Sequence, residues 1–282
     1  MINSIQKNKI GLSVLALISL ATFLLVLSLA QQNQLTTRPD DVPLRKEPNR
    51  TSKKIVSLKS GTKLTVLKRQ NGWWYVRDSK DDTKGWVASW VANNTFLKKP
   101  TALSEATIVL DPGHGGSDTG ALSYNNKYYE KTYTLKTALA TRKELEKTGA
   151  RVFMTRTTDV VVPLLYIPRQ AEKYQADAQI SFHFDASGTH NSASGISQYY
   201  YNSNSLALVK SLSSSLNNLP LENRGYDSTP YLVIKDVSRP AVLLELGFID
   251  SDKDLSYIRS STYQEKVAKD IRSGLMNYIQ SN

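Results

Sequence analysis

From residue 106 onward, short apolar runs of β-forming residues alternate with helical stretches, and this alternation constrains the fold more than any other feature. The runs are Thr107–Asp111, Arg151–Thr155, Gln179–His183, Ile196–Tyr201, Tyr231–Ile234 and Ala241–Leu246. Apolar residues recur at helical spacing near 130–148, 203–217 and 263–279. Nearly continuous apolar runs are typical of strands covered on both faces. The pattern predicts an α/β domain over 106–282, with a mixed or mostly parallel sheet flanked by helices.

Residues 41–97 have a different pattern, in which short β-rich runs are broken by turn residues and no helical stretch occurs. The runs are Lys54–Leu58, Leu64–Leu67, Trp73–Arg77 and Gly85–Val87. Asn71-Gly72 between two of them is a strong hairpin signal. The segment therefore predicts a small all-β barrel. Because so small a barrel needs large aromatic side chains in its core, we expect at least two of its four tryptophans to be buried.

The same segment resembles a bacterial SH3-like (SH3b) domain through Leu44-Arg45, Gly61, Trp73-Trp74-Tyr75-Val76 and Gly85-Trp86-Val87. Such domains usually target enzymes to peptidoglycan or peptides. Residues 31–105 hold 15 Lys/Arg against 7 Asp/Glu, whereas residues 106–282 hold 19 against 18. This basic excess is either a solvated surface or a contact for anionic wall polymers.

The N-terminal segment contains an apolar run, residues 10–30, without a single charge. A helix of that length is long enough to cross a membrane, and Lys7 and Lys9 before it would stay cytoplasmic. We therefore expect a membrane anchor over 1–30, a linker over 31–40 and an extracellular remainder, with a second linker over 98–105. The alternative is a signal peptide cleaved near Ala30, which leaves a secreted protein. Either location argues against nucleic acid as a partner.

The chain has no cysteine and only three histidines, so any metal site must use His, Asp and Glu. His114 follows the first strand in a glycine-rich loop, and His183 ends another strand. Open α/β sheets usually have their ligand-binding and catalytic sites at the carboxyl ends of their strands. Glu245 sits inside an apolar strand, where burial would raise its pKa and suit proton transfer. Glu130 begins a helix.

Each of these residues also has a purely structural interpretation. A histidine at a strand end can simply be hydrogen-bonded, Glu130 can be a charge favoured by the helix dipole, and Glu245 can form a salt bridge. His190 lies in a polar stretch and is expected to be an ordinary loop residue. From the residues alone, two histidines with a carboxylate form a common catalytic zinc set, but here they come from distant parts of the chain.

Five motifs of the C-terminal domain resemble those of zinc-dependent N-acetylmuramoyl-L-alanine amidases of the Amidase_3 type. They are Thr107–Asp118, Glu130-Lys131, Thr155-Arg156, Ser181-Phe182-His183 and Pro240–Phe248. The resemblance implies that His114, Glu130 and His183 bind Zn²⁺ and that Glu245 is the catalytic carboxylate. Two departures concern local geometry: Pro163 and Pro168 stand where the family has a Leu-x-x-Arg helix start, and Phe182, Phe184 and Asp185 replace commoner neighbours of His183.

The resemblance implies a peptidoglycan hydrolase that cleaves the amide between N-acetylmuramic acid and L-alanine and acts in cell-wall remodelling. The alternatives are a non-catalytic muropeptide-binding or signalling ectodomain, and a zinc peptidase that cuts elsewhere in the stem peptide. No long insertion that could serve as a built-in lid is visible in the sequence. Control by a separate regulatory membrane protein is therefore an open question.

Overall fold

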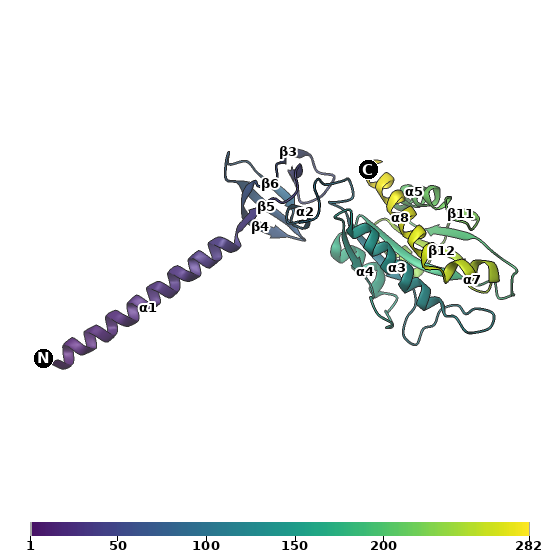
Figure 1. Cartoon of the computed structure of the whole chain (residues 1–282), viewed down its shortest axis with the longest axis horizontal. Coiled ribbons are helices and arrows are strands. Elements are labelled where there is room, and N and C mark those ends of the chain that lie inside the picture. Colours follow the sequence, from purple (N-terminus) through teal and green to yellow (C-terminus); the bar gives the residue numbers. More distant parts are fainter. Residues whose placement is uncertain (1, 282) are drawn as a thin grey trace. The chain divides into compact units, whose positions relative to one another are not determined.

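The computed structural model describes residues 2–281, and the chain divides into two compact units, Met1–Lys98 and Lys99–Asn282 (Figure 1). Within the first helix, α1 (Ile2–Gln32), side chains are described for residues 11–26 and 28. No helix of the described residues is both long and apolar enough to span a membrane. Lys7, Lys9 and Ala30, on which the predicted anchor or cleavage site partly depends, lie outside the described side chains.

The first unit contains a six-stranded antiparallel sheet in the order β1-β4-β5-β6-β2-β3. Its elements are β1 (Gln34–Thr36), β2 (Val42–Arg45), β3 (Lys54–Leu58), β4 (Lys63–Gln70), β5 (Trp73–Asp78), β6 (Lys84–Ala88) and the short helix α2 (Ser89–Ala92). The predicted small β-rich domain is confirmed. The expected linker 31–40 needs correction, since its residues 34–36 form β1, which pairs with β4. The physical reason is that Leu35 is apolar and is buried in the core of this unit.

Asn71 and Gly72 form the predicted hairpin between β4 and β5. Both have positive φ, 49° and 83°, as a two-residue type I′ turn requires. Trp73 and Trp86 are buried in the core, and Trp74 and Trp90 pack partly against it. The expectation that at least two tryptophans are core residues is therefore confirmed.

The second unit contains a six-stranded mixed sheet in the order β11-β10-β12-β9-β7-β8. All neighbouring strands are parallel except β10 and β12. The strands are β7 (Thr107–Pro112), β8 (Arg151–Met154), β9 (Ala178–Asp185), β10 (Ile196–Tyr200), β11 (Asn223–Ser228) and β12 (Ala241–Phe248). The helices are α3 (Glu130–Glu146), α4 (Tyr166–Tyr174), the 3₁₀ turn η1 (Ser203–Ser205), α5 (Leu206–Leu216), α6 (Leu232–Lys235), α7 (Asp252–Ile258) and α8 (Ser261–Ser281). This confirms the predicted α/β class.

Helices cover both faces of this sheet, and the side chains alternate between the two faces along each strand. Ile108 and Leu110 of β7 belong to the larger core, which includes residues of α3, α5 and α8. Val109 between them belongs to a second core with residues of α4 and α6. A buried sheet of this kind requires apolar residues at consecutive positions, which is what the sequence runs contain.

Three details of the predicted fold need correction. Tyr231–Ile234 was expected to be a strand, but α6 occupies Leu232–Lys235 and buries Val233 and Ile234, because an apolar run of four does not distinguish strand from helix. Strand β11 was not predicted, since its mostly exposed sequence lacks an apolar run. Helix α4 was also missed; Pro168 is its third residue, where the backbone N–H has no intrahelical partner and proline is tolerated.

Candidate metal centre and active site

His114 lies in the loop that leaves the carboxyl end of β7. Its φ is 62°, a left-handed conformation that residues other than glycine seldom adopt. The buried side chain of Arg156 holds this loop, donating to the carbonyl oxygens of Pro112 at 2.9 Å and Gly113 at 3.0 Å. His114 Nδ1 lies 2.9 Å from Asp118 Oδ2. A carboxylate bound to one ring nitrogen fixes the tautomer and leaves the other nitrogen's lone pair available to a metal.

Glu130 is the first residue of α3 and is buried. Its carboxylate accepts hydrogen bonds from the backbone N–H groups of Ala121 at 2.8 Å and Phe184 at 3.0 Å. Burial alone would raise its pKa, but hydrogen bonds from His114 and His183 outweigh burial and hold the pKa of Glu130 well below its usual range. Glu130 therefore stays ionised at neutral pH. Such a carboxylate suits a metal ligand better than a group that carries protons.

His183 and Glu245 stand side by side on the adjacent parallel strands β9 and β12, where they are paired in register. Burial alone would lower the pKa of His183, but its hydrogen bond to Glu130 and the charge of Glu130 raise that pKa to about 9. Burial raises the pKa of Glu245 to about 8. Glu245 is therefore the acid of the site that can hold and release a proton near neutral pH.

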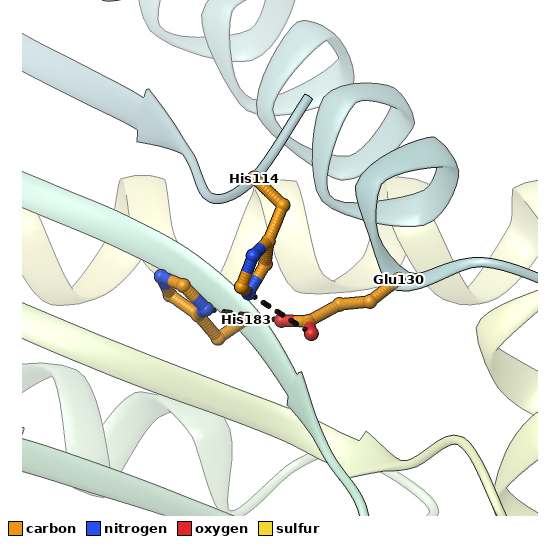
Figure 2. A group of neighbouring side chains, drawn as sticks. All are labelled: His114, Glu130 and His183. Atoms are coloured by element: carbon orange, nitrogen blue, oxygen red, sulfur yellow. Dashed lines mark hydrogen bonds and ion pairs between the residues drawn. The ribbon is translucent and has the colours of Figure 1, made fainter. Parts of the chain in front are cut away.

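Three of these four side chains converge. His114 Nε2 lies 3.1 Å from Glu130 Oε2, and His183 Nδ1 lies 2.9 Å from Glu130 Oε1 (Figure 2). The candidate ligand atoms of His114, Glu130 and His183 all lie within 4.8 Å of one another. His183 Nε2 is buried and has no hydrogen-bond partner in the described part of the chain.

The glycines of the loop leave the space that this convergence needs. A Cβ at position 120 would lie 2.6 Å from His114 Cδ2 and closer still to Glu130 Oε2. A Cβ at position 113 would lie 2.8 Å from His183 Nδ1 and closer still to two other atoms of that ring. A pocket lined by both histidines is also lined by Val161, Leu164 and Val233. Two imidazoles and a carboxylate around a shared space, with one imidazole nitrogen unpaired, fit a divalent metal ion.

The structure thus places the four predicted site residues toward the carboxyl ends of the central parallel strands β7, β9 and β12. His190 is a loop residue, as expected: its ring stacks on Tyr124 at 4.1 Å and lies 3.0 Å from Asp252. Sequence reasoning assigned no role to Asp118 or Arg156, which orient His114 and its loop. The available sequence signal for Arg156 was a charged residue directly after the apolar run Arg151–Thr155.

Comparisons with known proteins agree with this geometry. The family model described as N-acetylmuramoyl-L-alanine amidase matches residues 108–277, and a bacterial SH3 domain model matches residues 40–92. Over 267 residues the chain is 37% identical to a probable cell wall amidase, LytH, of Staphylococcus aureus, covering 92% of this chain and 89% of that relative.

Solved structures of such amidases share the fold. The catalytic domain of CwlV, an N-acetylmuramoyl-L-alanine amidase from Bacillus (Paenibacillus) polymyxa var. colistinus, is 30% identical with a TM-score of 0.60, covering 63% of this chain and 99% of that one. The amidase AmiC2 of Nostoc punctiforme is 30% identical with a TM-score of 0.59, covering 62% of this chain and 97% of that one.

Fold, site and comparisons together define a cell-wall hydrolase that acts on peptidoglycan amide bonds. The chain belongs to the N-acetylmuramoyl-L-alanine amidase family, and it combines the amidase domain with an SH3-like domain.

Proposed function

We propose that this amidase depends on Zn²⁺, bound by His114, Glu130 and His183, and that it releases the stem peptide by hydrolysing the bond between N-acetylmuramic acid and L-alanine in cell-wall remodelling. The observation that carries the proposal is the convergence of these three donors within 4.8 Å. Zinc is the favoured ion because nitrogen and carboxylate donors suit it, and catalytic zinc sites commonly have three protein ligands.

When bound, zinc would lower the pKa of a coordinated water and polarise the substrate carbonyl. Glu245 carries out the proton transfers of the reaction. Its carboxylate accepts a proton from the attacking water, and it then gives that proton to the leaving amine of L-alanine. Its pKa of about 8 suits both transfers, because the group can exist in either protonation state at neutral pH. Its Oε2, buried and unpartnered within the described chain, is available for them.

Product analysis tests the proposal. Purified cell wall is digested with the full chain, with and without a chelator, and the masses of the soluble fragments are determined by mass spectrometry. The expected products are stem peptides with a new amino-terminal L-alanine, and the chelator abolishes their release until zinc is restored. Fragments cut inside the stem would indicate a peptidase, and binding without release would indicate a muropeptide-binding ectodomain.

We further propose that residues 10–30 attach the protein to the cell membrane with the amidase domain outside, or direct its secretion with cleavage near Ala30. The support is the uncharged run itself and the two lysines before it. Fractionation of cells into membrane and medium, with the mass of the mature protein, distinguishes these outcomes.

The basic SH3-like domain is proposed to contact anionic wall polymers as well as peptidoglycan, through the excess of lysine and arginine in residues 31–105. Such a contact weakens as salt is added. Retention of the protein on walls with and without their anionic polymers, measured across a salt series, tests this.

A further inference from the structure

A row of side chains crosses the sheet next to the reacting centre. Glu245 on β12 is paired with His183 of β9 on one side and with Ser197 of β10 on the other. Strand β11 continues the row: its first residue, Asn223, pairs with Ile196, and the register shifts before Gln198 meets Tyr226. Arg224 therefore stands beside Ser197, two strands away from Glu245.

Arg224 points to the same face of the sheet as the site. Its neighbour Asn223 donates to the carbonyl of Ser213 in α5 at 2.9 Å, on the face that α5 covers. Side chains alternate along a strand, so Arg224 is directed to the opposite face. The site lies on that face as well, because Leu243, two residues from Glu245, belongs to the core shared with α4 and α6.

The guanidinium of Arg224 is held in place by an aromatic ring. Its central carbon lies 5.1 Å from the centroid of the Phe248 ring. The aliphatic part of the side chain passes Gly195, where a Cβ would lie 3.1 Å from Arg224 Cδ. Stacking on a ring occupies the face of the guanidinium and leaves the N–H groups at its edge free to donate.

Arg224 is exposed, and within residues 2–281 it forms no ion pair and no side-chain hydrogen bond. Asp185, near enough for its carboxyl group to interact electrostatically with Arg224, does not form an ion pair with it. A pre-positioned guanidinium with free donors matches a carboxylate, which it can bind through two parallel hydrogen bonds.

The spacing indicates which part of the substrate could reach this group. Neighbouring strands are about 4.8 Å apart, so two strands separate the row positions by roughly 10 Å. An extended peptide covers about 3.3–3.6 Å per residue, so about three residues lead from the reacting amide to Arg224. Peptidoglycan stem peptides carry free carboxylates over that length unless these are amidated.

We propose that Arg224 forms a subsite for a stem-peptide carboxylate within the first three residues after the scissile bond. The proposal rests on the amidase function above, and it predicts that the enzyme distinguishes acidic from amidated stems. Recognition of a carboxylate by one exposed arginine gives a discrimination of roughly tenfold.

Binding of the product peptide tests the subsite without depending on turnover. The full chain is titrated with a synthetic stem tripeptide bearing free carboxylates and with the same tripeptide bearing carboxamides. Wild type is expected to bind the acid form roughly tenfold more tightly. Arg224→Gln is expected to lose this preference, binding both forms as wild type binds the amide, and Arg224→Lys to retain part of it. Lys210→Gln, which removes the same charge from an exposed position on helix α5, should behave as wild type.

The proposal is overturned if wild type shows no preference, including no binding of either peptide, or if Arg224→Gln keeps the preference. Cleavage of the matching N-acetylmuramoyl tripeptides is measured in parallel. If wild type prefers the acid peptide but releases nothing from these substrates, the amidase proposal fails while the subsite stands. If wild type cleaves both forms but binds the acid and amide peptides equally, the amidase stands and the subsite fails.

Discussion

Substitution of Gly113 by alanine should separate the geometry of the metal centre from the stability of the fold. Gly113 has no positive φ, so alanine brings no backbone strain there. The new Cβ would lie 2.8 Å from His183 Nδ1 and closer still to Cε1 and Nε2, whereas ordinary contact begins at 3.4 Å. The imidazole must therefore move by about 1 Å, at an overpacking cost of roughly 1–3 kcal/mol.

Such a displacement acts directly on a proposed ligand. Disturbing the groups that orient a metal ligand typically reduces metal affinity 10–100-fold, and moving the ligand itself should cost at least as much. We expect Gly113→Ala to lower zinc affinity by a factor of at least about 10, measured by competition with a chromophoric chelator, and to reduce wall hydrolysis in parallel.

Gly188→Ala is the matched control, because a Cβ there meets nothing within 4 Å. Its φ of 79° makes alanine strained, so the control should lose about 1 kcal/mol of stability but keep the zinc affinity of wild type. If Gly113→Ala binds zinc within twofold of wild type while remaining folded, His183 does not bind the metal from the position described.

Three further predictions concern the acid and the ligands. Glu245→Gln should keep its zinc content but lose nearly all hydrolysis of purified wall; a wild-type rate would remove Glu245 from its assigned role. His114→Ala should lower zinc occupancy, and unchanged metal content by mass spectrometry would exclude it as a ligand. In chelator-treated protein, the fold favours protonated Glu245, since burial raises its pKa from an ordinary 4.5 to about 8. Wild type therefore loses stability as pH rises from 4.5 to 8, because the folded state keeps Glu245 protonated while the unfolded state ionises it. In denaturant unfolding, the free energy of unfolding of Glu245→Gln should rise relative to that of wild type by up to about 4 kcal/mol between pH 5 and 8. A difference that does not change with pH would contradict this.

Much of the fold could be predicted because long apolar runs and helical periodicity persist in the folded chain. The strands at 107–111 and 179–183 and the helix starting at Glu130 are where the patterns predict them. The failures occur where local sequence does not decide the structure. A four-residue apolar run at 231–234 became a helix through its packing, and the exposed edge strand β11 is specified by pairing with β10.

The residues of the candidate site could be identified from the sequence, but their approach to one another in space could not. His114 and His183 could be assigned to strand ends from the sequence, because a glycine-rich loop and a strand pattern surround them. Their approach to Glu130 depends on the strand order and on backbone donors from Ala121 and Phe184, neither of which a linear pattern contains. Arg224 was likewise invisible as a site residue before the register of β11 placed it in the same row as Glu245.

The strand order has a consequence for the newly made protein. His114 follows the first strand of the domain, whereas Glu245 lies on β12, the last strand in sequence, and β12 inserts between β9 and β10. Chains emerge from the ribosome amino-terminus first, so Glu245, the proposed proton carrier, joins its partners only after nearly the whole domain has been made. A partly synthesised or truncated chain that ends before β12 therefore lacks the proposed proton carrier.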